Sequence, residues 1–368
     1  MHEQEELVDC RPFGELPNGE QALLFTLRNG RGLTARITNF GATLVSLLAP
    51  DRRGCFANVL LGYDDLQSYR SGTHYLGALI GRYANRIAGA RFTLQGQRHE
   101  LQANDGATCL HGGGAGFDKV LWTARRMHTH AGNSTLILEH VSPHLTGGFP
   151  GELHVEAAFT LAVNDTLTVA LRATTDRTTV LSLTSHPYFN LTGSGGRSDI
   201  LGHELQIISD RMLPIDNRMI PTGELRPVEN TPFDFRTPLP IGLRIDADDP
   251  QLRIARGYDH CWLLDQAANQ EAPQVRVYEP VSGRVPELRC ATPGLQFYSG
   301  NFLDGRDVGR KDPALCFRSG FCLEPEQLPD APNQPDFASA TLRPEEEYRS
   351  TFSYRFGVRD QKAPRAGS

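Results

Sequence analysis

Lysine is scarce in this 368-residue sequence, and only Lys119, Lys311 and Lys362 stand among its 37 basic residues. Schiff-base catalysis needs a lysine amine and therefore has few candidates. The 37 basic residues face 43 acidic ones, which gives a net charge of −6, and the basic residues form no run. Because nucleic-acid binding leaves a basic patch or stripe in a sequence, we expect no nucleic-acid partner.

Long hydrophobic runs and paired-cysteine motifs are also missing. The longest apolar stretch, residues 42–49, is far shorter than the roughly 20 residues of a membrane-spanning helix, so we expect no membrane segment. The acidic start, MHEQEELVDC, lacks the pattern of a secretory signal. The seven cysteines are scattered without a C-x-x-C pair. This distribution is typical of reduced thiols and predicts a cytoplasmic location.

Several catalytic motifs are absent as well. The segment His111-Gly112-Gly113-Gly114 resembles the oxyanion loop of lipases, but the sequence has no G-x-S-x-G nucleophile turn. Phe117 stands where the last glycine of a dinucleotide-binding G-x-G-x-x-G would be. No P-loop, H-E-x-x-H or EF-hand spacing occurs either. We therefore expect no metal site.

Glycine (36 residues), proline (24 residues) and short alternating segments are abundant, and they favour strands over helices. The clearest alternation runs from Val155 to Val163, turns at Asn164-Asp165 and returns from Leu167 to Ala173, which predicts a hairpin with one buried face. The other predicted strands are Ala22 to Leu27, Leu33 to Ile37, Thr43 to Leu48, Val120 to Arg125, Leu136 to Val141, Val180 to Thr184, Val275 to Tyr278 and Phe352 to Phe356.

Helical periodicity and domain linkers are nearly absent. Residues 77–90 could be taken for a helix, but their three glycines favour strand and loop. Without repeats or linkers, the sequence predicts one large all-β domain over residues 19–357. Residues 1–18 are expected to be a loose N-terminal segment and residues 358–368 a flexible tail.

Six polar motifs stand where predicted strands end in turns, a common place for active-site residues. They are Gly81-Arg82-Tyr83-Ala84-Asn85-Arg86-Ile87, Leu110-His111-Gly112-Gly113, His186-Pro187-Tyr188-Phe189-Asn190-Leu191, Tyr258-Asp259-His260, Gln296-Phe297-Tyr298-Ser299-Gly300-Asn301, and Glu324 followed by Leu328-Pro329-Asp330-Ala331-Pro332-Asn333. Taken singly, each has an equally good structural explanation, such as a surface arginine, a turn histidine or a paired carboxylate.

In order and spacing, these motifs resemble the aldose 1-epimerase (galactose mutarotase) family, over a stretch from about Asn39 to Tyr354. The resemblance implies a large β-sandwich, the supersandwich, whose concave face holds a monosaccharide. It also implies that α and β anomers of free aldohexoses, such as galactose and glucose, are interconverted without a cofactor.

The resemblance further implies a role for each site residue. Glu324 would be the base at the anomeric hydroxyl and His186 the acid at the ring oxygen, which requires a protonated His186 and an ionised Glu324 near neutral pH. The implied sugar-binding residues are Asn85, Arg86, His111, Asp259 and Gln296. The sequence departs from the family pattern at Ser185, where many members carry Asn, and at Pro325-Glu326, where many carry Thr-Gln. These changes affect the surroundings of the site and leave the sugar preference open.

Three alternatives remain. A hexose-phosphate 1-epimerase of the same fold would need an arginine cluster for the phosphate. A non-catalytic sugar-binding module would need neither Glu324 nor His186 as a reactive pair. A glycosidase would use Asp259 and Glu324 as its two carboxylates. The sequence does not decide between a monomer and a homodimer.

Overall fold

Strands dominate the computed structural model, which describes residues 7–265, 272–310 and 314–360. Within these residues, the α-helices are two segments of six residues each, α1 (Leu66–Ser71) and α2 (Pro250–Ala255). The predicted all-β class is therefore confirmed. None of the helices in the described ranges has the length and hydropathy needed to cross a bilayer.

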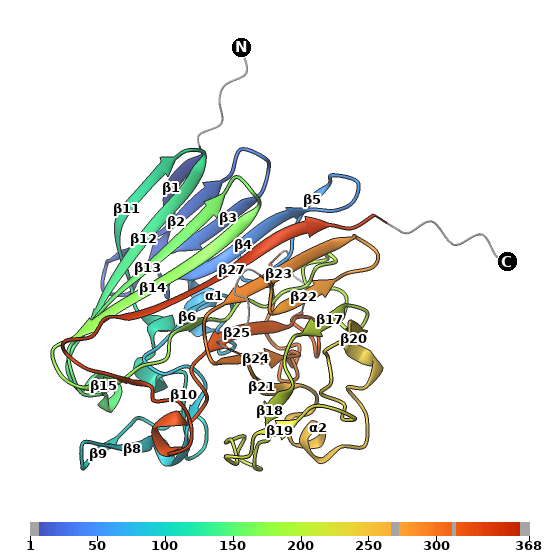
Figure 1. The fold of residues 1–368 in the computed structure, drawn as a ribbon. Helices are drawn as coiled ribbons and strands as arrows, with labels where there is room; N and C mark the ends of the chain where they lie inside the picture. The colour runs from blue at the N-terminus through green and yellow to red at the C-terminus, as the bar shows by residue number, and fades with distance from the viewer. Residues whose placement is uncertain (1–6, 266–271, 311–313, 361–368) are drawn as a thin grey trace.

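The largest sheet has nine strands and contains the predicted hairpin (Figure 1). In sheet order its strands are β11 (Thr123–His130), β12 (Asn133–Ser142), β13 (Leu153–Ala162), β14 (Thr166–Thr175), β27 (Tyr348–Val358), β23 (Arg284–Cys290), β22 (Val275–Tyr278), β17 (Glu204–Ile207) and β20 (Leu239–Pro240). Buried and more exposed residues alternate along β13 and β14, since successive side chains of a strand point to opposite faces. The hairpin prediction is confirmed.

A five-stranded N-terminal sheet packs against this one through the apolar face of β2 and the strands β12 and β13 (Figure 1). Its strands are β1 (Val8–Glu15), β2 (Gln21–Arg28), β3 (Thr34–Thr38), β4 (Thr43–Pro50) and β5 (Phe56–Asn58). The expectation of a loose segment up to residue 18 is wrong for β1, which pairs antiparallel with β2. β1 is an edge strand whose Pro12 and Gly14 interrupt the alternation, so its sequence carries no strand signal.

The third sheet also has five strands, and it positions the site. In sheet order it contains β19 (Arg226–Pro227), β18 (Arg211–Leu213), β21 (Asp259–Leu263), β24 (Gly294–Tyr298) and β25 (Cys322–Glu326). The register pairs Gln296 with Glu324, and Asp259 with Tyr298. Residues paired directly across antiparallel strands share a face, so these side chains stand on one side of the sheet.

Short strand pairs and loops complete one side of the site. The pairs are β6 (Leu79–Ile80) with β16 (Thr184–Ser185), β7 (Arg86–Ile87) with β10 (Cys109–Leu110), β8 (Arg91–Leu94) with β9 (Gln97–Glu100), and β15 (Thr179–Val180) with β26 (Thr341–Leu342). Residues 77–90 are strand and loop, ending in a single 3-10 turn, Ala88–Ala90, as expected from their glycines.

Two predicted strands are only partly confirmed. Val120 to Arg125 becomes a strand only from Thr123, because the preceding backbone bonds to Asn39 and Gly41 instead. Val180 to Thr184 is divided between β15 and β16, because Leu181 and Ser182 donate to the backbone of Ala340 and Arg82. Of the expected C-terminal tail, residue 358 is the last of β27, and residues 361–368 lie outside the described residues.

Candidate active site

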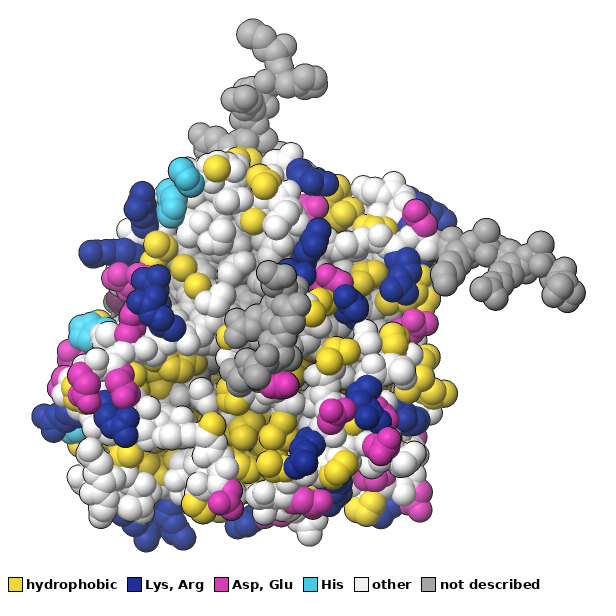
Figure 2. Space-filling model, viewed as in Figure 1, with side chains coloured by type: hydrophobic (Ala, Val, Ile, Leu, Met, Phe, Trp, Pro, Cys, Tyr) yellow, Lys and Arg dark blue, Asp and Glu magenta, His cyan; other side chains and the backbone are white. Residues whose placement is uncertain are grey.

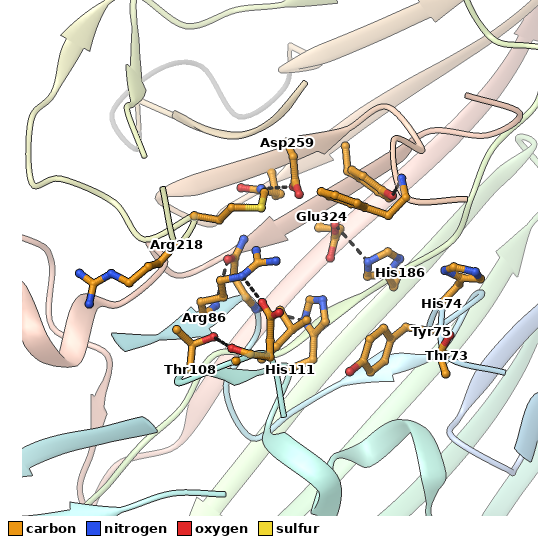
Figure 3. A pocket seen from close by; sticks show the side chains of 18 of the residues that line it. Thr73, His74, Tyr75, Arg86, Thr108, His111, His186, Arg218, Asp259 and Glu324 are labelled. Carbon is orange, nitrogen blue, oxygen red and sulfur yellow. Dashed lines mark hydrogen bonds and ion pairs between the residues drawn. The ribbon is translucent and has the colours of Figure 1, made fainter. Parts of the chain in front are cut away.

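A cavity of about 470 Å3 opens between the third sheet and the loops around β7, β10 and β16 (Figure 3). It brings together all the site residues expected from the sequence. These are Asn85, Arg86, His111, His186, Asp259, Gln296 and Glu324. They lie on six separate chain segments, so the cavity exists only in the folded protein.

The sheet supplies the acceptors of the cavity. Gln296 Nε2 donates to Asp259 Oδ1 over 2.7 Å, which orients both side chains. Gln296 Oε1 and Glu324 Oε2 are buried and have no hydrogen-bond partner. Buried polar atoms in native proteins are normally paired. Both atoms belong to residues that line the cavity, where the hydroxyl groups of a ligand would pair with them.

The loops supply donors through two residues in the left-handed backbone region, Asn85 (φ 62°) and His111 (φ 53°). Such non-glycine conformations are costly and tend to cluster at functional sites. The two residues hold each other: His111 N donates to Asn85 O over 2.9 Å, and Asn85 N donates to His111 Nδ1 over 3.1 Å. Gly112 follows with φ 88°, and a Cβ there would lie 2.1 Å from the oxygen of Gly81. Only glycine fits at this turn.

Arg86 is oriented by a residue that the sequence analysis missed. Its Nε donates to Asp105 Oδ2 over 2.8 Å, and Asp105 also lines the cavity. Asp105 lies 19 residues further along the chain in a turn, and no local pattern links it to Arg86. Only Nε of the guanidinium bonds to Asp105, so its two terminal nitrogens remain as donors for other partners.

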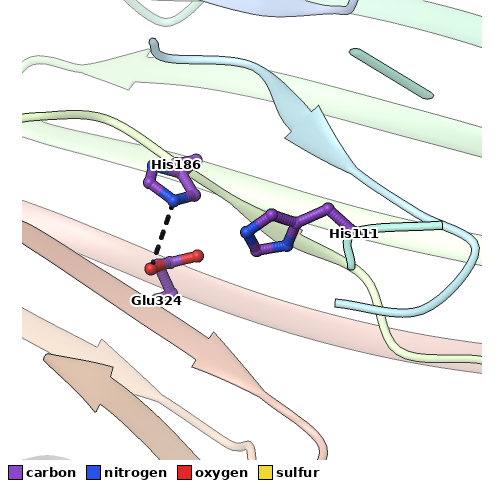
Figure 4. Close-up of side chains that lie close together, drawn as sticks. All are labelled: His111, His186 and Glu324. Atoms are coloured by element: carbon purple, nitrogen blue, oxygen red, sulfur yellow. Dashed lines mark ion pairs between the residues drawn. The ribbon is translucent and has the colours of Figure 1, made fainter. Parts of the chain in front are cut away.

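His186 and Glu324 form a contact between a histidine and a carboxyl in the cavity (Figure 4). His186 Nε2 lies 3.5 Å from Glu324 Oε1, and the side chains are 6% and 3% exposed. On its other side, His186 Nδ1 lies 3.4 Å from the thiol sulfur of Cys322, two residues before Glu324 on β25. A proton can therefore pass within the pair with little movement of either side chain.

Burial governs the protonation of this pair. It lowers the pKa of His186 to about 4. It also raises the pKa of Glu324 well above its usual range, and the charges of Glu326 and Asp259 add to the rise. These shifts favour a neutral His186 and a protonated Glu324, the reverse of the expected ion pair. Both arrangements contain the same number of protons and differ only in where one proton lies.

Three donor atoms of His111, His186 and Glu324 lie within 4.8 Å of one another, which is close enough to examine as a metal site. Because His111 Nδ1 accepts the hydrogen bond from Asn85, the neutral ring carries its proton on Nε2. Burial and the charges of His186 and Arg86 lower the pKa of His111 well below its usual range, so the ring stays neutral. A metal needs a lone pair on the ligand, and this ring offers an N–H. The trio fits a hydroxyl-rich ligand better than a metal ion.

Aromatic side chains form much of the remaining wall, and the sequence analysis did not select them. Tyr75 packs edge-on against His111, with ring centroids 4.7 Å apart. Tyr188 and Tyr298 lie against His186. Tyr298 lies two residues from Gln296 on β24, so strand alternation was the signal that could have found it. Tyr188 lies beyond the end of β16, where no strand pattern marks it. His74 also lines the cavity.

The fold and cavity define a β-sandwich protein equipped for acid/base chemistry on a small polar ligand. A sequence profile described as aldose 1-epimerase matches residues 23–355. Galactose mutarotase from Rattus norvegicus is 42% identical over 347 residues, which cover 94% of this chain and 97% of that protein. Aldose 1-epimerase from Escherichia coli K12 is 36% identical over 342 residues, covering 92% and 96% of the two chains.

A solved structure agrees with these matches. The crystal structure of galactose 1-epimerase from Lactobacillus acidophilus superposes with a TM-score of 0.83 at 25% identity, covering 95% of this chain and 98% of that one. The chain belongs to the aldose 1-epimerase family. The family and the supersandwich-like fold expected from the sequence motifs are thereby confirmed.

Proposed function

We propose that this protein is an aldose 1-epimerase that interconverts the α and β anomers of free aldohexoses such as D-galactose and D-glucose. The observation that carries the proposal is the buried contact of 3.5 Å between His186 Nε2 and Glu324 Oε1 inside the cavity of a family member. Two proton carriers at this separation can serve the two oxygen atoms bonded to the anomeric carbon. Family membership and the relatives' names support the same reaction.

The reaction exchanges two protons between the enzyme and the sugar. Glu324 takes the proton of the C1 hydroxyl while His186 gives a proton to the ring oxygen, so the bond between C1 and the ring oxygen breaks and C1 becomes an aldehyde carbon. A half-turn about the bond between C1 and C2 then presents the other face of the aldehyde. Reclosure returns one proton to His186 and the other to the new C1 hydroxyl. The enzyme ends in its starting state.

The protonation that burial favours for this pair suits the cycle. A protonated Glu324 beside a neutral His186 is the arrangement the enzyme holds while the sugar is open, because each group has then completed its transfer. Entry of a closed sugar requires the proton to move from Glu324 to His186 first. Sugar hydroxyls that replace the apolar surroundings with hydrogen bonds favour the charged pair and support this shift.

The remaining cavity residues suit the binding of a sugar ring. Arg86 and His111 offer N–H donors to sugar oxygens. Asp259 and the unpaired Gln296 Oε1 accept from ring hydroxyls. The Asn85 amide accepts from the backbone of Arg86 and donates one N–H to Glu326, which leaves its second N–H for a sugar oxygen. Fixing the ring in this way adds to the rate beyond the roughly 100- to 10,000-fold that general acid/base catalysis supplies.

A free sugar fits the cavity better than a phosphorylated one. The described residues that line the cavity include two arginines, Arg86 and Arg218, and no lysine. Arg86 Nε is bonded to Asp105 over 2.8 Å, and Arg218 to Asp216 over 2.7 Å. A phosphate dianion requires a cluster of cations free to bind it, and both of these already neutralise a carboxylate.

The other two alternatives fit less well. A glycosidase would need a second free carboxylate, whereas Asp259 is bonded to Gln296 and the reactive partner of Glu324 is a histidine. A binding module would gain nothing from burying an acid and a base in contact, since burial of both groups costs stability.

The direct test is proton NMR of an equilibrium mixture of galactose anomers. The enzyme should produce exchange between the two anomeric signals, and glucose 6-phosphate should exchange much more slowly than glucose. Equal or faster exchange of glucose 6-phosphate would favour the hexose-phosphate alternative. Absence of exchange with every aldohexose would leave the sugar-binding module.

We also infer that the protein works in a reducing compartment such as the cytoplasm, on a monosaccharide and without a nucleic-acid partner. All seven cysteines are free thiols. On the face shown in Figure 2, basic and acidic side chains are interspersed, and no basic stripe crosses it. Titration of the denatured, unreduced protein with a thiol reagent should count seven thiols.

A further inference from the structure

A second buried carboxyl, that of Glu326, lies on the same strand as Glu324 and outside the cavity wall. Residues two apart on a strand point to the same face and lie roughly 7 Å apart, so Cys322, Glu324 and Glu326 follow one another along one face of β25. Glu326 is 0% exposed and Glu324 2% exposed. Each has one carboxyl oxygen without a partner. Glu324 borders the cavity, and Glu326 does not.

Asn85 connects Glu326 to the site. Its Oδ1 accepts from the backbone N of Arg86 over 2.9 Å, which fixes the orientation of the amide. The amide nitrogen therefore points at Glu326 and donates to its Oε1 over 3.2 Å. The backbone N of Asn85 in turn holds His111. Glu326 thus anchors a residue that lines the cavity and orients a second one.

Six titratable groups around Glu326 offer little positive charge to balance an ionised carboxyl there. They are Tyr83, Arg86, Asp259, Cys261, Glu324 and Tyr348. Burial raises the pKa of both tyrosines and of the Cys261 thiol, so these three stay neutral. Arg86 is the cation of this set, and it is shared with Asp105 and Asp259.

Glu324 faces a comparable set of neutral groups. Besides the carboxylates and Arg86, it contacts His186, and its charge also acts on Cys322, Tyr188, Tyr298 and Tyr354. Burial keeps this thiol and these tyrosines neutral as well. Two carboxyls buried this close cannot both be ionised near neutral pH. Burial raises the pKa of Glu326 well above its usual range too, but the hydrogen bond from the Asn85 amide opposes this rise. No such hydrogen bond opposes the rise in the pKa of Glu324, so we expect Glu326 to carry the charge of the two.

We propose that Glu326 is a positioning residue for the mutarotation: its buried carboxylate, held by Asn85, keeps the transferable proton on the pair of His186 and Glu324. The negative charge behind Glu324 opposes a second negative charge there, so the pair loses its proton only at higher pH. The enzyme therefore keeps a usable proton over a wider alkaline range than a neutral side chain at this position would allow. This inference rests on the proposed function.

The first test compares the pH profiles of kcat/KM for Glu326→Gln and the wild type. Glutamine keeps the size and the acceptor for Asn85 but removes the charge. We expect the alkaline limb to move to lower pH by about one unit or more, with activity near pH 6 largely retained. The control, Glu287→Gln, removes a distant carboxylate on β23 that pairs with Arg276, and it should leave the limb in place. An unmoved limb in a folded Glu326→Gln protein would overturn the proposal.

The second test needs no activity and so separates this proposal from the proposed function. In protein labelled with 13C at the glutamate carboxyls, one buried carboxyl should give the signal of a protonated acid at pH 7. We expect that signal to disappear in Glu324→Gln and to remain in Glu287→Gln. If the protonated signal instead belongs to Glu326, Glu326 carries no charge at this pH and the proposal is wrong, even where the wild type catalyses mutarotation. The wild type and Glu324→Gln suffice for this assignment if Glu326→Gln does not fold.

Discussion

Replacing Glu324 by glutamine is expected to separate catalysis from binding and from stability. Glutamine has nearly the same shape, and its Oε1 can still accept from His186 at the present 3.5 Å. It cannot take a proton from the C1 hydroxyl. General base catalysis contributes roughly 100- to 10,000-fold, so kcat should fall by that factor, which corresponds to about 2.7–5.5 kcal/mol in the activation barrier.

Binding and folding should respond differently. The residues that hold the sugar ring remain in place, so the Kd for galactose should change less than tenfold. Burial raises the pKa of Glu324 above its usual range. A carboxyl with a raised folded-state pKa destabilises the fold increasingly as pH rises above the unfolded-state pKa, because ionisation then favours the unfolded chain. Glu324→Gln removes this cost and should melt at the same or a higher temperature than the wild type at pH 8.

Three measurements test this: polarimetry gives kcat, isothermal titration calorimetry with galactose gives Kd, and thermal unfolding at pH 5 and pH 8 gives the melting temperature. Glu287→Gln, a matched substitution on β23 far from the cavity, serves as control. A Glu324→Gln protein that retains more than a tenth of wild-type kcat would refute the role of Glu324 as base. A variant that loses galactose binding as well would show that Glu324 holds the sugar rather than reacting with it.

Three further outcomes are expected. The pH profile of kcat/KM should be bell-shaped. Because the pKa of His186 is lowered to about 4, the pair of His186 and Glu324 takes up a second proton only in acid, and because the pKa of Glu324 is raised, the pair loses its one proton only on the alkaline side. A rate that climbs steadily across pH 4–9 would contradict this. Gly112→Ala should lower activity and stability together, since its Cβ would lie 2.1 Å from the Gly81 oxygen and its φ is 88°. A variant with the melting temperature and kcat of the wild type would show that the loop adjusts to the added Cβ at little cost. Phe159→Ala leaves a cavity at a fully buried position on β13 and should reduce the unfolding free energy by about 3–5 kcal/mol in denaturant titrations. The kcat per folded molecule should stay unchanged. A loss of less than 1 kcal/mol would mean that the surrounding core residues fill the cavity.

Much of the fold could be predicted from local sequence patterns. The hairpin of β13 and β14 could be predicted because the alternation of its residues depends only on neighbours along the chain and on a two-residue turn. β1 could not, because Pro12 and Gly14 break its alternation and its place at the sheet edge comes from pairing with β2. The division between β15 and β16 likewise depends on backbone partners at Arg82 and Ala340, which no local pattern indicates.

The site divides in the same way. Its expected residues lie in motifs, and the cavity contains every one of them. Asp105 escaped prediction because its role exists only through contact with Arg86. The protonation state of His186 could not be predicted either. The sequence motifs implied a charged His186, whereas its pKa is set by how deeply the folded chain buries it. Glu326 was visible as a departure, but not as a buried neighbour of Asn85.

The most direct test of the central claim, that His186 and Glu324 interconvert sugar anomers, is polarimetry of freshly dissolved α-D-galactose in a buffer that catalyses mutarotation weakly. Wild type, His186→Ala and an enzyme-free sample would be followed side by side. We expect wild type to speed the optical change far beyond the enzyme-free rate and His186→Ala to lose at least about 100-fold of this acceleration. A wild type indistinguishable from buffer, or a fully active His186→Ala, would contradict it.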